Sequence, residues 1–192
     1  KINAQIKSGA PYDVFMSADM EFPQALHQQG FAVAPPRVYA RGVLVLWTLQ
    51  PLDMQQGMRV LLNPEVKKVA LPNPKLAPYG EEAMRVLDYY KLRAAVEPKL
   101  IYGESIAQVN QYIDTRSASI GFTAKAVVLA PQLQGRGKWV EVPKESYQPI
   151  AQGVVILKHG AETNAAAAQR FVEFLGSVRA RGIFEKYGYL LP

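Results

Sequence analysis

Apolar positions along the chain follow two different spacings. Short runs rich in β-branched and aromatic residues have strand length, whereas between them apolar residues recur every three to four positions, the spacing of one helix face. The runs predict strands at 13–18, 43–48, 67–73, 99–103, 119–124, 138–143 and 151–158. The helical spacing predicts helices at 20–29, 81–93, 106–114, 124–130, 164–175 and 178–186. Strands alternating with helices of this length indicate an α/β fold with largely parallel sheets.

Composition limits the size and class of the protein. A chain of 192 residues with 49% hydrophobic content can bury a core, as one large domain or two small lobes. No window reaches the ~18 consecutive apolar residues that a membrane span requires. The chain has no cysteine, which excludes disulfides and thiolate chemistry and fits an oxidising compartment. Its opening stretch, "KINAQIKSGAP", lacks the apolar region of a signal peptide.

The formal net charge of +6 raises the question of nucleic acid. Lysine and arginine are dispersed, however, and the densest spots are only "KK" at 67–68 and "GRGK" at 135–138. A nucleic-acid surface needs a basic stripe, often with exposed aromatics among the cations. We therefore expect no nucleic-acid partner, and a basic surface that suits anionic ligands.

The stretch "GESIAQVNQYID" carries a clear helix start. Ser105 is followed three residues later by Gln108, which is the spacing of a capping box, so the helix is predicted to begin at Ile106. The Ser105 hydroxyl would accept from the Gln108 amide. The amides of Ile106 and Ala107 then have no intrahelical partner, and an anion would suit them.

A second helix start lies at "APYGEEAM". Pro78 fixes φ and has no N–H to lose, Tyr79 and Gly80 enter the first turn, and the glutamates favour the positive end of the helix. The Tyr79 amide is therefore a candidate donor. Each start follows a predicted strand, where ligand sites of open α/β sheets form. The alternative is that both are ordinary helix starts without a ligand.

Enzymatic chemistry finds little support in the sequence. His27 and His159 stand far apart, and His27 lies in a polar helix end. No G-x-S-x-G elbow, P-loop or G-x-G-x-x-G fingerprint is present. Asp13 and Asp19 flank a predicted strand and are typical of a turn residue and a helix cap. The sequence predicts no enzyme, no cofactor and no metal-cation site.

Five segments resemble the molybdate-binding periplasmic proteins, the substrate-capturing components of bacterial ABC transporters. They are "QIKSGAPYDVFMSAD" (5–19), "VYARGVLVLW" (38–47), "NPKLAPYGEEA" (73–83), "YGESIAQVNQYID" (102–114) and the closing "FLGSVRARGIFEKYGYLLP" (174–192). Together they span nearly the whole chain in order. The resemblance implies a type II periplasmic-binding fold, in which two α/β lobes are joined by crossover strands around a cleft. On this chain it assigns 1–40 and 150–192 to lobe I and 41–149 to lobe II.

The resemblance also implies a site. In the family, neutral hydrogen-bond donors hold a tetrahedral oxyanion, and the matching donor positions fall on Tyr79 and Ile106. Expected cleft neighbours are Pro78, Gly80, Ser105, Ala107 and Tyr147. Some members use a tyrosine in the segment matching "IGFTA", but this chain has Ala124 there, so that contact should be absent.

Tyr147 and Glu104 each leave an alternative open. Tyr147 precedes a predicted crossing strand, where simple packing competes with a hinge or cleft-edge role. Molybdate is a dianion whose oxygens only accept, whereas a carboxylate in the site would favour a protonated oxyanion. Glu104 is expected to face solvent at its helix start.

The sequence departs from the family at its beginning. Members carry a strand, a helix and a second strand, and then a serine-rich turn, before the segment matching "KINAQI"; this chain starts at Lys1. Two donors normally come from that region, and Ser8 and Ser17 do not replace them. We therefore expect lobe I to be incomplete, the monomer to bind molybdate poorly or not at all, and exposed strand edges to favour self-association.

The function implied by the resemblance is extracytoplasmic, periplasmic capture of molybdate, or of tungstate, for the membrane permease of an ABC transporter. Two other classes stay open. One is the ligand-sensing effector domain of a transcription regulator, which can share the two-lobed fold. The other is a small enzyme acting on an anionic substrate.

Overall fold

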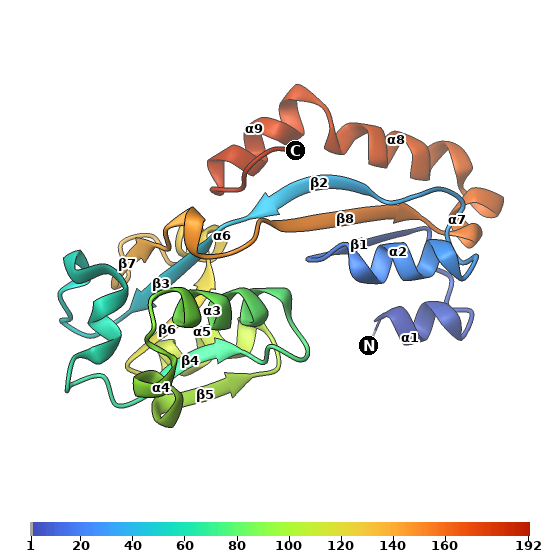
Figure 1. Cartoon of the computed structure of the whole chain (residues 1–192). Helices are drawn as coiled ribbons and strands as arrows, with labels where there is room; N and C mark the ends of the chain where they lie inside the picture. Colours follow the sequence, from blue (N-terminus) through green and yellow to red (C-terminus); the bar gives the residue numbers. More distant parts are fainter. Residues whose placement is uncertain (1) are drawn as a thin grey trace. The chain divides into compact units, whose positions relative to one another are not determined.

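The computed structural model describes residues 2–192, and the chain divides into two compact units. Unit 1 consists of the described residues up to Gly42 together with Ala151–Pro192. Unit 2 is the continuous segment Val43–Ile150. Each unit has its own sheet and its own helices (Figure 1). The fold is mixed α/β.

Unit 2 is built on a five-stranded sheet with the order β5-β4-β6-β3-β7. The strands are β3 (Leu44–Thr48), β4 (Val69–Pro72), β5 (Leu100–Gly103), β6 (Ile120–Ala124) and β7 (Lys138–Glu141). β4 pairs in parallel with β5 and β6, whereas β3 pairs antiparallel with β6 and β7. The prediction of largely parallel sheets was therefore wrong. The alternation of helices and strands in the sequence predicts where strands lie but not the direction in which they pair. An antiparallel pair needs no helical crossover, so the sequence pattern does not distinguish it from a parallel pair.

Helices connect these strands on both faces of the sheet. They are α3 (Pro78–Tyr89), α4 (Arg93–Val96), α5 (Ile106–Asp114) and α6 (Lys125–Val128), with 3₁₀ segments η1 (Met54–Leu62), η2 (Glu97–Lys99) and η3 (Lys144–Ser146). α5 has the predicted bounds. α3 begins three residues before the predicted 81 and ends before the predicted 93, because Pro78 takes the first helical position and Lys91 adopts a φ of 56°. Neither η1 nor α4 was predicted from the sequence.

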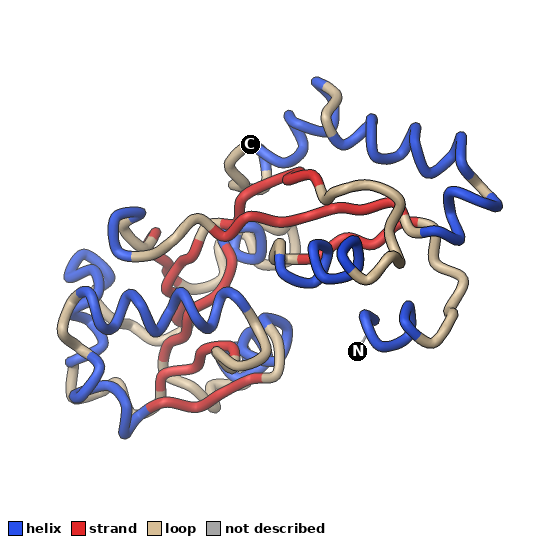
Figure 2. Tube along the Cα trace, turned by 45° about the vertical axis from the view of Figure 1, so that its right-hand side comes forward, coloured by secondary structure: helices blue, strands red, loops and turns tan. Residues whose placement is uncertain are grey.

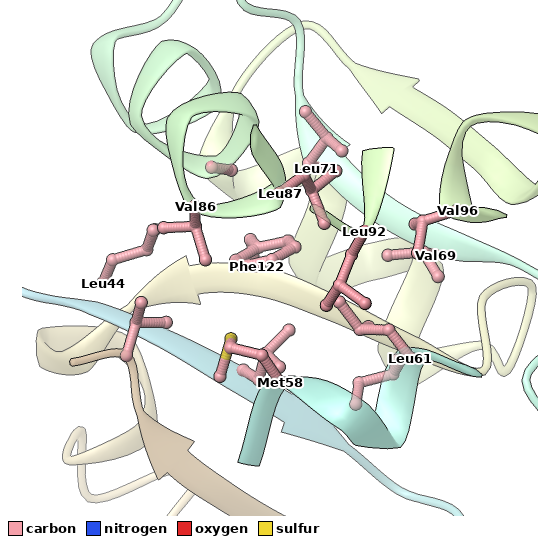
Figure 3. Packing of buried hydrophobic residues seen from close by; sticks show 14 of the residues in the cluster. Leu44, Met58, Leu61, Val69, Leu71, Val86, Leu87, Leu92, Val96 and Phe122 are labelled. Atoms are coloured by element: carbon pink, nitrogen blue, oxygen red, sulfur yellow. The ribbon is translucent and has the colours of Figure 1, made fainter. Parts of the chain in front are cut away.

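The core of unit 2 fills both faces of its sheet. On one face, Val86 and Leu87 of α3 pack with Leu44, Leu71 and Phe122 of the strands (Figure 3). The other face carries a second buried cluster: Val45, Trp47, Ala70, Val109, Ile113, Ala118 and Val128. Every residue of β3 and β6 is buried. Continuous apolar runs of this kind are expected for strands that are covered on both sides.

Unit 1 contains a three-stranded sheet with the order β1-β8-β2. Its strands are β1 (Val14–Ser17), β2 (Arg37–Gly42) and β8 (Ile150–Ile156), and β1 runs antiparallel to β8. Its helices are α1 (Ile2–Lys7), α2 (Glu21–Gln28), α7 (Lys158–Thr163), α8 (Ala165–Leu175) and α9 (Val178–Lys186), shown as blue coils in Figure 2. α9 has the predicted bounds. α1, α7 and β2 were not predicted as elements.

The end of the chain is joined to β2. The Arg41 amide donates to the Leu190 carbonyl at 2.7 Å, and the Leu190 amide donates back at 2.9 Å. Beside this pair, the Tyr39 hydroxyl donates to Gln152 Oε1 at 2.7 Å. Burial, assisted by Tyr189, raises the pKa of Tyr39 to about 12, so the phenol stays protonated. Across residues 2–192, no helix has the length and apolar character needed to cross a bilayer.

Candidate functional site

The two predicted helix starts lie at the same end of the unit 2 sheet. β4 and β5 are parallel neighbours, with Pro72 opposite Gly103, and their carboxyl ends lead into α3 and α5. The Asn73 amide donates to the Gly103 carbonyl at 2.7 Å, which joins the two loops directly. The structure therefore brings together two segments that are about thirty residues apart in sequence.

The start of α3 depends on tight backbone packing. Ala77 is extended, Pro78 occupies the first helical position, and Tyr79 is the second residue of the helix, within the first turn that the sequence predicted it to enter. A Cβ on Gly80 would collide with the Pro72 carbonyl oxygen, so only glycine allows α3 to begin against the end of β4. Tyr79 is 4% exposed and belongs to the buried cluster of unit 2. Because Tyr79 is buried, backbone N–H groups of this first turn are the groups that α3 can offer to an anion at its positive end.

The start of α5 is the predicted capping box. The Gln108 amide donates to Ser105 Oγ at 3.3 Å, and Gln108 Oε1 accepts from the Glu104 amide at 2.7 Å. The helix begins at Ile106, which confirms the predicted start. Within residues 2–192, the amides of Ile106 and Ala107 donate to no protein acceptor. They remain available to a ligand at the helix N-terminus.

The neighbouring end of β6 adds no tyrosine. Ala124 is buried and closes the strand before α6. The preceding Thr123 hydroxyl donates to Asn110 Oδ1 at 2.6 Å, which ties β6 to α5. Glu104, which the sequence analysis expected to face solvent, is exposed. The Ile106 and Ala107 amides are therefore the candidate donors that α5 supplies at this end of the sheet.

A buried carboxylate on α3, Glu82, was not predicted from the sequence, and it lies beside the segment that contains the predicted cleft neighbour Tyr147. Glu82 Oε2 accepts from the Gln148 amide at 2.7 Å, and the Tyr147 hydroxyl accepts from the Leu44 amide at 3.2 Å. Burial raises the pKa of Glu82, although the Gln148 bond and Arg85 oppose the rise. Burial likewise raises the pKa of Tyr147. A signal for Glu82 existed, since it lies three residues after Tyr79 and one before Ala83, on the face that α3 buries.

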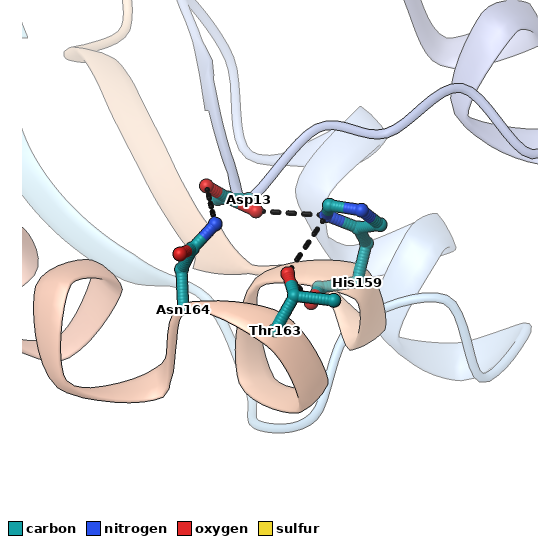
Figure 4. Close-up of polar contacts among 4 residues, drawn as sticks. All are labelled: Asp13, His159, Thr163 and Asn164. Carbon is teal, nitrogen blue, oxygen red and sulfur yellow. Dashed lines mark hydrogen bonds and ion pairs between the residues drawn. The ribbon is translucent and has the colours of Figure 1, made fainter.

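In unit 1, the structure joins two residues that the sequence analysis treated separately. His159 Nδ1 lies 2.8 Å from Asp13 Oδ1, and Asn164 Nδ2 donates to Asp13 Oδ2 at 3.0 Å (Figure 4). The Thr163 hydroxyl approaches the same Nδ1 at 3.3 Å and donates to the His159 carbonyl. A catalytic triad needs its nucleophile at the other ring nitrogen. This cluster instead ties the start of β1 to α7 and α8.

The described residues supply neither a metal-cation site nor the further oxyanion donors that the resemblance implies. The part of the chain that the structure describes holds no group of three or more His, Asp or Glu side chains arranged for a metal ion. The donors that the resemblance places before Lys1 lie outside the described residues. Tyr79 and Ile106 thus remain the two predicted donor positions, both in unit 2.

Comparison with known proteins assigns the chain to a family. The family described as bacterial extracellular solute-binding protein matches residues 1–190. The chain belongs to this family. Its fold is that of the periplasmic binding proteins, and the solved Azotobacter vinelandii periplasmic molybdate-binding protein superposes with a TM-score of 0.88 at 33% identity. That comparison covers 100% of this chain and 83% of the other.

Curated relatives within the family carry a specific name. The molybdate-binding protein ModA of Rhodobacter capsulatus is 39% identical over 187 residues, which cover 97% of this chain and 72% of that protein. The ModA protein of Azotobacter vinelandii is 39% identical over 188 residues, with 97% and 73% covered. These relatives are named as binding proteins, not as enzymes. The resemblance stated from the five sequence segments is therefore confirmed.

Proposed function

We propose that this chain is an extracytoplasmic substrate-binding protein, periplasmic in location, that captures molybdate for the membrane permease of an ABC importer. The observation that carries the proposal is the pairing of two helix N-termini beyond adjacent parallel strands, with the Ile106 and Ala107 amides available. The names of the 39%-identical relatives support molybdate as the anion.

The donor set suits a fully deprotonated oxyanion. Molybdate offers only acceptors, so backbone N–H groups at positive helix ends can bind it without a proton on the ligand. The nearby Glu82 carboxylate already accepts from Gln148 and pairs with Arg85, and Glu104 is exposed. Tungstate has the same charge and tetrahedral shape, and we include it in the proposed ligand class.

Titration calorimetry on the full chain tests the proposal. Molybdate and tungstate should release binding heat that sulfate and phosphate reproduce only weakly. Failure of molybdate to bind at any accessible concentration would contradict the proposed function.

The two Ile106 variants test the α5 donor. Ile106→Ala keeps the amide and should change the dissociation constant less than about threefold. Ile106→Pro deletes the amide, and a lost hydrogen bond to a charged group costs about 1.5–3 kcal/mol, or about 10- to 150-fold in affinity. Proline is tolerated at the first helical position, and Ser105 is already extended with φ −155° and ψ 167°. A harmless Ile106→Pro would remove the α5 start from the site.

We also propose that unit 1 can self-associate through the free side of β1. This strand is at the edge of its sheet, and Met16 on it is 37% exposed. Ile2, Phe15, Met16 and Phe22 help line an open hollow of about 310 Å³ there. An exposed strand edge with apolar neighbours offers both hydrogen bonds and burial to a second copy.

A further inference from the structure

Glu82 is a buried acid on the second turn of α3. Its side chain is only 11% exposed, whereas the side chain of its neighbour Glu81 is 57% exposed. Glu82 Oε2 accepts from the Gln148 amide at 2.7 Å, and Oε1 lies 3.2 Å from Arg85 Nε. Both oxygens are therefore engaged, which offsets part of the cost of burying the carboxylate.

The partner of Glu82 lies at the end of unit 2. Gln148 precedes by two residues Ile150, where unit 2 ends and β8 begins. The adjacent Tyr147 accepts from the amide of Leu44, the second residue of unit 2. The two chain ends of unit 2 are thus tied to each other at Tyr147 and to α3 at Gln148.

The two candidate helix starts are fixed in different ways. α5 has a side-chain cap, since Ser105 accepts from Gln108. α3 has none, because its cap residue is Ala77. Glu82 lies three residues after Tyr79, so the two side chains leave the same face of the helix. The bond to Gln148 therefore attaches this face of α3, about one turn from its uncapped end, to the end of unit 2.

We infer that Glu82 is a positioning residue for oxyanion binding: its carboxylate fixes the first turns of α3 to the segment Tyr147–Ile150 and thereby holds the Tyr79 end in place. The inference rests on the proposed function. Its physical basis is that donors facing an anion must be held within a fraction of an ångström, which requires a rigid second layer of contacts. Glu82 itself does not touch the ligand.

Calorimetry with three variants tests the inference. Glu82→Ala removes the acceptor and should weaken molybdate binding about tenfold. Glu82→Gln keeps an oxygen for the Gln148 amide and should recover affinity to within about threefold of the unmodified chain. Glu81→Ala removes the adjacent exposed carboxylate, which also pairs with Arg85, and should leave affinity unchanged. Unaltered binding by Glu82→Ala, or an equal loss in Glu82→Gln, would overturn the inference.

Amide hydrogen exchange without ligand gives a second, independent readout. In Glu82→Ala the Gln148 amide should exchange faster, whereas in Glu82→Gln and Glu81→Ala its protection should persist. Unchanged protection of Gln148 in Glu82→Ala would also overturn the inference. If the unmodified chain binds no molybdate, the proposed function fails, and the exchange data still decide whether Glu82 holds this segment.

Discussion

The two units bury their sheets to very different degrees. In unit 2, clusters on both faces cover the sheet, and Leu44, Leu46 and Phe122 are fully buried. In unit 1 the buried cluster among the described residues is smaller, and Met16 remains exposed at the sheet edge; the cluster consists of Ile6, Phe15, Leu26, Ala32, Val155 and Leu157. Unit 2, which carries both candidate donors, therefore has the core expected to hold donors rigidly.

Spectroscopy can separate the units because of where the tryptophans lie. The chain has two, Trp47 and Trp139, and both belong to unit 2. Tryptophan fluorescence thus follows unit 2 alone, whereas far-UV circular dichroism follows the helices and strands of both units. Denaturant titrations with the two probes should give different midpoints if the smaller core of unit 1 makes it less stable.

The largest expected effect is in the core of unit 2. Phe122→Ala removes a fully buried ring from the cluster between α3 and the sheet and should cost about 3–5 kcal/mol in free energy of unfolding. The midpoint measured by fluorescence should fall accordingly. A loss below about 1 kcal/mol would show that this core is not tightly packed.

A smaller loss is expected from the matching change in unit 1. Phe15→Ala removes a ring that is 7% exposed and packs in a small cluster, so the cost should fall below the usual range for phenylalanine, at about 2 kcal/mol. The change should appear in circular dichroism and leave the fluorescence midpoint in place. An equal shift in both probes would show that the units unfold together.

The sheet edges should also behave differently. Met16→Lys places a charge on the exposed edge strand of unit 1 and should weaken self-association about tenfold, as judged by sedimentation. Tyr102→Lys makes the equivalent change on β5, an edge strand of unit 2, and should leave the solution mass unaltered. A chain that is monomeric at all concentrations would contradict the proposed association through β1.

The smallest effect concerns pH. The pKa of Glu82 is raised in the folded chain above its usual 4.5, chiefly by burial, so folding favours the protonated carboxyl. This contribution to stability is fully present below pH 4.5 and is lost as pH rises through the raised pKa. The free energy of unfolding of the unmodified chain, measured by fluorescence and compared with that of Glu82→Gln, should therefore decline as pH rises from 4.5 through the raised pKa. A rise with pH would mean that the Gln148 and Arg85 contacts outweigh burial.

Local sequence determined the helix starts. The capping box at Ser105 and Gln108, and Pro78 at the first position of α3, are satisfied within one turn, so their spacing alone predicted where α5 begins and where Tyr79 stands. Five ordered segments likewise identified the family, which the comparisons confirmed. The positions of the strands other than β2 were predictable for the same reason, since alternation and β-branching are local properties.

Tertiary structure decided what depends on partners distant in the chain. The antiparallel pairing of β3, the bond between Asp13 and His159, and the burial of Glu82 against Gln148 each join residues that lie far apart in sequence. Neither propensity nor periodicity encodes which partner a polar side chain will meet, because that follows only from how strands and helices pack. The chain therefore specified the candidate donors locally, whereas packing decided what holds them in place.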